Sequence, residues 1–257
     1  MNNKKAFTLA ELLISMAIIG VISVLMVPVF NSTQKKALEV GTAHFHSMMS
    51  QAIKHYMVDN EIETLSDAPM FYKDYVYDEE TAEENTVAEQ KAYDELNDFF
   101  YKYLKVKKVC SNLKFGVDNE CFPTRISNIN EDVDNLIYIT DRAYVLDNGV
   151  VLSMKPPTHG RPATLQVDIN GKKGPNTVGR DIWSMSVYAD GVVSEHLHMY
   201  TMKKRFRQDP DEMARRIKRI ANMRFAYFCS DLYGSGTWRY GAGCFARFEN
   251  NGFKFDY

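Results

Sequence analysis

Residues 4–13 read KKAFTLAELL, and they open an apolar run that continues as ISMAIIGVISVLMVPVF to residue 30. Between Phe7 and Phe30 the side chains are apolar or small, apart from Thr8, Glu11 and two serines. A helix of these 24 residues would rise about 36 Å, which exceeds the roughly 30 Å of hydrocarbon in a bilayer. The run therefore predicts a membrane-spanning helix at the start of the chain.

Glu11 is the unusual residue of this run. A carboxylate costs about 2.5–3.5 kcal/mol at the centre of a spanning helix and less near its end, so a partner is expected. A secretory signal peptide would carry its small-residue cleavage site after the apolar region, whereas Ala6 lies before it. Cleavage between Ala6 and Phe7 would create an α-amino group at Phe7, one helical turn from Glu11. That amine can pair with Glu11 of the same helix or of a neighbouring one.

Lys4 to Leu13 closely resemble the processing motif of type IV prepilins and type II secretion pseudopilins, with Ala6 in place of the usual glycine. The resemblance implies that a prepilin peptidase cleaves between Ala6 and Phe7. The same enzyme, acting as a methyltransferase, would then methylate the new amine of Phe7. The resemblance also implies that Glu11 assists subunit assembly. The match is specific over about the first thirty residues, whereas the rest of the chain resembles a pilin in pattern only.

Two helix-weakening residues lie within the apolar run. Gly20 is a poor helix former, and Pro28 has no backbone N–H to donate to the carbonyl of Val24. Many type IV pilins carry a glycine and a proline in this segment, and the resemblance implies that the helix can loosen there within a filament. We therefore predict that the helix is weakest between Gly20 and Pro28.

Beyond Phe30 the helical pattern continues but becomes amphipathic. Apolar or small residues recur at three- and four-residue spacing, which predicts one helix from about Thr8 to Asp59. The predicted packing stripe comprises Ala37, Val40, Gly41, His44, Phe45, Met48, Ala52 and Tyr56. With the resemblance, the chain divides into a leader at 1–6, a transmembrane and assembly helix at 7–30, an amphipathic continuation at 31–59 and a globular pilin-like head at 60–257.

The head is predicted to combine helices with a sheet. A second helix is expected over residues 87–106, and from residue 136 onward the apolar residues alternate as strands require. The pairs Asn148-Gly149 and Asp190-Gly191 predict tight hairpin turns. Because the strands follow the helices in a block, the expected class is α+β with an antiparallel sheet. This outline resembles the pilin ladle, with the long N-terminal helix as its handle.

Two elements are expected near the C-terminus. Asp209 and Pro210 have the residue types of a helix cap and of a first helical residue, so a short basic helix is predicted over residues 209–222. The closing stretch GCFARFENNGFKFDY, residues 243–257, is interpreted as a last hairpin tethered by Cys244.

The chain contains four cysteines, Cys110, Cys121, Cys229 and Cys244. None forms a C-x-x-C pair, which argues against zinc binding and thioredoxin-like chemistry. Of the three possible connectivities, 110–121 with 229–244 needs the least chain closure, and each bridge would add roughly 3 kcal/mol in an oxidising compartment. The lysines at 4 and 5 predict a cytoplasmic N-terminus with the head outside, which favours disulfides over free thiols.

Residues 168–181, DINGKKGPNTVGRD, join two predicted strands. Asp168, Asn170, Asn176 and Asp181 carry oxygen ligands of the kind that calcium prefers, and three glycines allow the backbone to turn. The loop is not an EF-hand, and the lysines at 172 and 173 would oppose a cation. Turn chemistry is the first interpretation, and a calcium site formed by Asp168, Asn170 and Asp181 is the alternative.

The net charge of −2 and the ordinary apolar content identify no partner, but the charges are unevenly placed. Residues 59–98 hold fourteen acidic against two basic side chains, and residues 203–224 hold nine basic against three acidic ones. We expect the basic segment to contact acidic segments of neighbouring subunits, with nucleic-acid binding as the alternative. The basic side chains are Lys203, Lys204, Arg205, Arg207, Arg215, Arg216, Lys218, Arg219 and Arg224.

The sequence contains no enzyme motif, whether a phosphate-binding glycine loop, H-E-x-x-H or G-x-S-x-G. The expected function is a structural subunit of a type IV pilus-like filament, built from copies of itself and other pilin-like subunits on an inner-membrane assembly platform. A type II secretion pseudopilin and a monomeric membrane-anchored binding protein are the alternatives. The expected location is the cytoplasmic membrane, with the head outside, and then an extracytoplasmic filament. No cofactor is expected apart from the calcium alternative.

Overall fold

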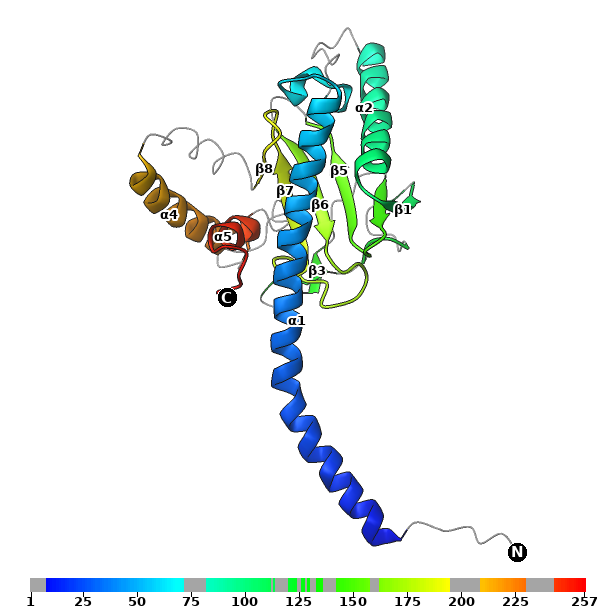
Figure 1. The fold of residues 1–257 in the computed structure, drawn as a ribbon, viewed down its shortest axis with the longest axis vertical. Coiled ribbons are helices and arrows are strands. Elements are labelled where there is room, and N and C mark those ends of the chain that lie inside the picture. Colours follow the sequence, from blue (N-terminus) through cyan, green and yellow to red (C-terminus); the bar gives the residue numbers. More distant parts are fainter. Residues whose placement is uncertain are drawn as a thin grey trace, which may run out of the picture.

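The computed structural model describes residues 8–71, 82–111, 113, 120–123, 126–127, 129, 133–135, 142–157, 162–194, 209–229 and 243–257. Helix α1 (Leu9–Asp59) carries the head on its C-terminal half, and its N-terminal half extends well beyond the head (Figure 1). The single long helix that the sequence predicts is therefore confirmed.

The elements of the head follow α1 in chain order. Two short 3-10 helices, η1 (Leu65–Asp67) and η2 (Pro69–Phe71), precede helix α2 (Ala82–Tyr103). The strands are β1 (Val106–Cys110), β2 (Ile126–Ser127), β3 (Val133–Asn135), β4 (Ala143–Leu146), β5 (Val151–Lys155), β6 (Ala163–Asp168), β7 (Ile182–Val187) and β8 (Val193–Ser194). Helices α4 (Pro210–Phe228) and α5 (Cys244–Asn250) follow the strands.

Six strands form one antiparallel sheet in the order β1-β4-β5-β6-β7-β8, and β2 pairs with β3 in a separate two-stranded sheet. Both predicted hairpin turns are present, between β4 and β5 and between β7 and β8. Gly149 and Gly191 adopt positive φ values of 87° and 78° in these turns, a conformation that glycine adopts without steric cost. The α+β class with an antiparallel sheet is confirmed.

The C-terminal half of α1 packs against the sheet (Figure 1). Its buried residues recur at three- and four-residue spacing, as one face of a helix requires. They are Leu38, Thr42, Phe45, Met49, Ala52, Ile53 and Tyr56. Trp183 of β7 is also buried, and its indole N–H donates to Thr42 Oγ1 at 3.0 Å. The helix and the sheet therefore share one apolar core.

The predicted packing stripe of α1 is partly wrong. Val40 is 61% exposed, and Ala37 and His44 are exposed as well. The buried face instead contains Thr42, whose hydroxyl is satisfied by Leu38 O and Trp183. The predicted stripe follows the spacing of residues along the chain, whereas the face that is buried is the one that fits the surface of the sheet.

Helix α2 confirms the second predicted helix with shifted bounds, because it begins at Ala82 rather than 87 and ends at Tyr103 rather than 106. It ends earlier because the chain enters β1 at Val106. Phe99 and Phe100 are buried, and the ring of Phe100 lies 4.5 Å from that of Tyr144, centroid to centroid. Aromatic packing of this kind fastens α2 to the sheet.

Helix α4 confirms the basic helix, but it runs to Phe228 rather than ending at 222. Asp209 Oδ1 accepts a hydrogen bond from the backbone N–H of Glu212 at 2.9 Å, and Pro210 occupies the first helical position. The predicted cap is therefore confirmed. Figure 1 shows α4 projecting from the head on the side opposite to α2.

The predicted final hairpin over residues 243–257 is wrong. Residues 244–250 form helix α5, in which Cys244, Phe245 and Phe248 are buried. The ring of Phe248 lies 4.7 Å from that of Trp183, centroid to centroid. Contact with the sheet therefore favours a helix here, because helical spacing brings these residues onto one face. After a turn at Gly252, residues 253–257 form a tail that is neither helix nor strand.

Candidate functional site

The N-terminal half of α1, residues 9–30, exposes a surface that is apolar apart from Glu11, Ser15 and Ser23. It is called here the apolar segment. Its large side chains are 48% to 79% exposed. Among the described residues, α1 is the one helix whose length and composition would allow it to cross a membrane. The hydroxyls of Ser15 and Ser23 donate to the carbonyls of Glu11 and Ile19, at 2.7 and 2.8 Å. These groups therefore need no water, as an apolar environment requires.

Glu11 closes a capping box at the start of α1. Its Oε2 accepts from the backbone N–H of Thr8 at 2.9 Å and from the Thr8 hydroxyl at 2.8 Å. In return, the backbone N–H of Glu11 lies 3.3 Å from Thr8 Oγ1. The sequence T-L-A-E has the form of a capping box, so the sequence alone would have predicted this role, which is absent from the expectations stated for Glu11. A carboxylate offers about four acceptor sites, so two bonds from Thr8 leave capacity for an amine.

The two helix-weakening residues lie within the apolar segment, as the sequence requires. A Cβ added at Gly20 would meet nothing within 4 Å, so no packing contact in the monomer requires glycine there. Pro28 lies inside α1. Figure 1 shows the N-terminal half of α1 curving away from the line of its C-terminal half, as a helix does near a proline. That the helix is weakest between these residues stays a prediction.

Residues 1–27 match the family model described as the prokaryotic N-terminal methylation motif. The chain carries the prepilin and pseudopilin signature. The motif covers the expected cleavage site between Ala6 and Phe7, which lies outside the described residues. No curated protein and no solved structure matches the chain.

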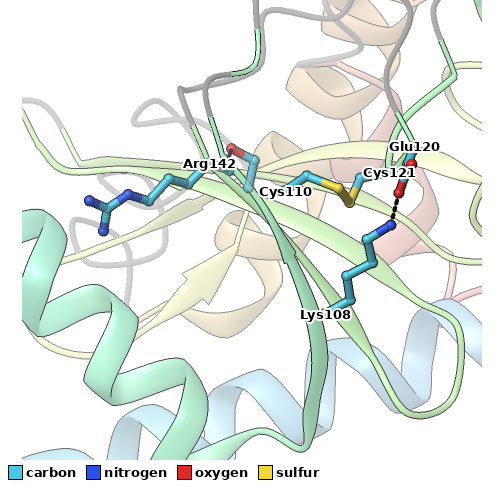
Figure 2. Close-up of a disulfide and its surroundings, with 6 residues drawn as sticks. Lys108, Cys110, Glu120, Cys121 and Arg142 are labelled. Atoms are coloured by element: carbon cyan, nitrogen blue, oxygen red, sulfur yellow. Dashed lines mark hydrogen bonds and ion pairs between the residues drawn. A yellow bond between two sulfur atoms is a disulfide. The ribbon is translucent and has the colours of Figure 1, made fainter.

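The head of this prepilin-like chain contains both expected disulfides, Cys110–Cys121 and Cys229–Cys244. The first links the end of β1 to the segment before β2. Figure 2 shows it beside an ion pair between Lys108 and Glu120, which joins the same two segments. The predicted connectivity is therefore confirmed. The second bridge links the end of α4 to the start of α5.

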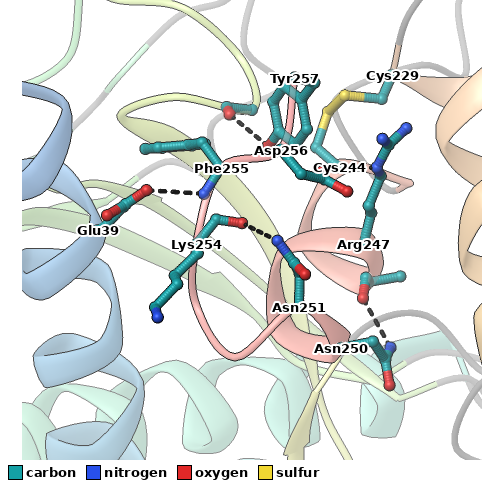
Figure 3. A network of polar contacts seen from close by, with 12 residues as sticks. Glu39, Cys229, Cys244, Arg247, Asn250, Asn251, Lys254, Phe255, Asp256 and Tyr257 are labelled. Atoms are coloured by element: carbon teal, nitrogen blue, oxygen red, sulfur yellow. Dashed lines mark hydrogen bonds and ion pairs between the residues drawn. A yellow bond between two sulfur atoms is a disulfide. The ribbon is translucent and has the colours of Figure 1, made fainter. Parts of the chain in front are cut away.

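The C-terminal tail ties three elements together (Figure 3). The backbone N–H of Phe255 donates to Glu39 Oε1 of α1 at 2.8 Å, and Arg247 of α5 pairs with Asp256 at 2.8 Å. The hydroxyl of Tyr257 donates to the carbonyl of Gly179 at 2.8 Å. Burial raises the pKa of Tyr257, so the hydroxyl keeps its proton. The tail therefore connects α1, α5 and the β6–β7 loop.

The β6–β7 loop encloses what we call the oxygen cluster, Asp168, Asn170, Asn176 and Asp181. Both aspartates are fully buried. Asp168 Oδ1 accepts from the backbone N–H of Asn170 at 3.2 Å, and the carboxylate of Asp181 accepts from those of Asn176 and Thr177 at 2.8 and 2.7 Å. Burial and the neighbouring charge of Asp181 raise the pKa of Asp168 to about 8, and burial raises the pKa of Asp181.

The structure brings together the residues that the sequence proposed as oxygen ligands, and it places Lys172 and Lys173 on the exposed side of the loop. Within the described residues no group of three or more His, Cys, Asp or Glu side chains could hold a metal ion. The oxygen cluster contains two such residues, and the other two are asparagines.

The charged surfaces of the head lie on α4 and α2. On α4, Glu212 pairs with Arg215 at 3.1 Å and with Arg216 at 2.5 Å, which neutralises part of the positive charge. Lys218 and Arg219 are exposed and form no ion pair with another described residue. Exposed carboxylates of α2 include Glu89, Asp94 and Asp98. Residues 203–208, the remainder of the basic segment, lie outside the described residues.

Proposed function

We propose that this protein is a structural subunit of a type IV pilus-like filament, cleaved and N-methylated by a prepilin peptidase and polymerised through α1. The observation that carries the proposal is the apolar segment with Glu11 at its start. A helix that buries one face of its C-terminal half in the head and exposes a mainly apolar N-terminal half needs a second apolar environment. Before assembly that environment is the cytoplasmic membrane, and in the filament it is the apolar segments of neighbouring subunits.

In this proposal Glu11 has two successive partners. In the single chain its carboxylate accepts hydrogen bonds from Thr8. After cleavage before Phe7, the same carboxylate has capacity for the charged amine of a neighbouring subunit, an interaction that is strong in an apolar environment. Other pilin-like subunits and the inner-membrane assembly platform would be the further partners, and no enzymatic role is proposed. The lysines at 4 and 5 support a cytoplasmic N-terminus with the head outside.

Three substitutions separate capping from charge pairing. Glu11→Ala removes both roles, Glu11→Gln keeps an oxygen for the capping box but removes the charge, and Thr8→Ala keeps the charge but removes the capping hydroxyl. With prepilin peptidase present, we expect the amount of each Glu11 variant in sheared filaments to fall at least about tenfold. That decrease corresponds to a loss of about 1.4 kcal/mol or more of assembly free energy. Thr8→Ala should retain most of it.

Intact-mass measurement on the same samples should show a chain that begins at Phe7 and carries one extra methyl group. Retention of residues 1–6 in the presence of the peptidase would contradict the processing step. Full incorporation of all three variants would contradict a role of Glu11 in assembly, and absence of the wild-type chain from sheared filaments would favour a monomeric membrane-anchored binding protein. A type II secretion pseudopilin shares the assembly chemistry, and it is distinguished by a filament that forms only with a secretion secretin and its substrates.

We also infer that neighbouring subunits pair the basic face of α4 with the acidic face of α2. The two helices lie on opposite sides of one head, so they meet only between two copies (Figure 1). Lys218→Glu with Arg219→Glu should therefore reduce incorporation, and adding Glu89→Lys with Asp98→Lys should partly restore it. Lys254→Glu, at an exposed lysine of the tail, is the control. Normal filaments with reduced DNA retention would favour nucleic-acid binding instead.

A further inference from the structure

A cleft of about 480 Å³ opens between α1 and the β6–β7 loop, at the end of the head nearest the apolar segment. Figure 1 shows β6 running toward this end of the head. The wall formed by α1 carries the amides of Asn31 and Gln34 and the ammonium group of Lys35, and the opposite wall includes Thr177 and Arg180. Its volume lies within the roughly 300–1,000 Å³ that small-molecule sites occupy. The cleft is therefore large enough for a small ligand.

Two positive charges at this cleft are held by one aromatic ring. Lys35 Nζ lies 5.7 Å from the centroid of the Phe255 ring, and Arg180 Cζ lies 5.9 Å from the same centroid. The ring is buried, and Figure 3 shows the backbone N–H of Phe255 bonded to Glu39 of α1. A cation near an aromatic face is attracted to it. The ring therefore positions one cation from α1 and one from the loop beside the same cleft.

Neither charge is neutralised within the described part of the chain, where Lys35 and Arg180 form no ion pair. The neighbouring carboxylates have other partners. Glu39 accepts from the backbone of the tail, and Asp256 pairs with an arginine of α5. Asp181 is buried and accepts from the backbone of its own loop. Because like charges repel, an anion in the cleft would stabilise both cations.

The donor groups of the cleft suit a phosphate. The guanidinium of Arg180 offers parallel N–H groups that match two phosphate oxygens, and the ammonium of Lys35 acts as a compact point charge. The amides of Asn31 and Gln34 can donate to further oxygens. A phosphodiester group presents the negative charge and the several acceptors that this set requires.

The depth of the cleft along α1 indicates where such a phosphate comes from. Lys35 follows the last residue of the apolar segment, Phe30, by about 7.5 Å along the helix axis, at 1.5 Å per residue. The headgroup layer on each side of the hydrocarbon core is about 5–8 Å thick. With the apolar segment in a bilayer, the cleft therefore opens at the level of the lipid phosphates.

We propose that the cleft between α1 and the β6–β7 loop binds the phosphate of an anionic phospholipid through Lys35 and Arg180. The proposal rests on the membrane stage of the proposed function, before the subunit enters a filament. A lipid bound there would hold the head against the membrane surface in one orientation. Incorporation into a filament would then require release of that lipid.

Native mass spectrometry of the full chain in a mild non-ionic detergent measures lipid binding directly. The wild-type chain should hold one phosphatidylglycerol, at least about fivefold more tightly than the neutral phosphatidylcholine. Lys35→Gln and Arg180→Gln should each weaken phosphatidylglycerol binding about fivefold, and Lys35→Arg should retain most of it. A wild-type chain without preference for phosphatidylglycerol would overturn the proposal.

Lys36→Gln is the matched control. Lys36 is exposed and lies outside the cleft, so this variant removes an equal charge at nearly the same depth. It should leave phosphatidylglycerol binding nearly unchanged, and equal weakening in Lys36→Gln and Lys35→Gln would show diffuse surface attraction instead of a site. The Tm of each variant without lipid should match that of the wild type. If Lys35→Gln does not fold, Arg180→Gln, on the opposite wall, decides.

Two further measurements separate the source of the phosphate and the two proposals. Millimolar inorganic phosphate should not displace the lipid, and displacement would overturn the lipid assignment in favour of a free anion. The wild type and all variants should float with vesicles of pure phosphatidylcholine, because the apolar segment alone inserts there. Failure of the wild type to float would overturn both proposals. Flotation with unchanged phosphatidylglycerol binding in Lys35→Gln and Arg180→Gln would overturn this inference and leave the filament function standing.

Discussion

Val24 and Phe45 lie on the same helix, yet Val24 is 74% exposed and Phe45 is 0% exposed. Both are apolar, so the residue type alone does not separate their surroundings. Around Phe45 the helix meets a sheet assembled from residues more than sixty positions away along the chain. Around Val24 the helix has left the head (Figure 1).

One helix therefore has two roles, one in the core of the head and one outside it. The buried half of α1 is part of the core, so its side chains determine whether the head folds. The apolar segment contributes nothing to that core, so its side chains are free to be selected for contact with lipid or with other chains. Substitutions in the two halves should therefore change different measurable properties, and three pairs of substitutions test this division.

The largest effect is expected in the buried half. Phe45→Ala should lower the free energy of unfolding of the head by about 3–5 kcal/mol, because it leaves a cavity between α1 and the sheet. The measurement is denaturant unfolding of the full chain in detergent, followed by tryptophan fluorescence. Val24→Ala is the matched control in the apolar segment and should change the same quantity by less than about 0.5 kcal/mol. Similar losses of unfolding free energy in both variants would contradict the division between the two halves of α1.

A smaller effect, of opposite sign, is expected at Pro28 of α1. Pro28→Ala restores a backbone hydrogen bond to Val24 O, so it should stabilise the helix locally by up to about 3 kcal/mol. Hydrogen exchange in detergent should then slow for the amides near residue 28, while the Tm of the head stays unchanged. Gly20→Ala should act in the same direction by about 1 kcal/mol. Unchanged exchange in the proline variant would show that the segment is not weak there.

The smallest effect concerns two threonines that make the same helical hydrogen bond. Thr42 and Thr33 both donate to a carbonyl one turn earlier, but Thr42 also accepts from Trp183 at 3.0 Å. Thr42→Val should therefore lower the free energy of unfolding by about 1–3 kcal/mol, since it leaves the indole N–H of Trp183 buried without a partner. Thr33→Val, at an exposed position of α1, should lower the same free energy by less than about 0.5 kcal/mol. Equal costs would mean that the contact with Trp183 contributes nothing.

The N-terminal motif, the bounds of α1, the two glycine hairpin turns and the disulfide pairing were all predictable from the sequence. Each depends on residues that are close together along the chain. Helix caps and tight turns are selected by three or four residues, and a short loop brings its cysteines together at little entropic cost. The capping role of Glu11 belongs to this class as well, because Thr8 and Glu11 alone define it.

The buried face of α1, the helix at 244–250 and the surroundings of the oxygen cluster required the tertiary structure. The face of α1 depends on which side chains fit the sheet, so Thr42 is buried and Val40 is exposed. Helix α5 forms where a hairpin was predicted, because helical spacing places Phe245 and Phe248 together against Trp183. The sequence alone therefore determined the elements whose energetics are local. The tertiary structure decided which faces are buried, since burial depends on contacts between distant parts of the chain.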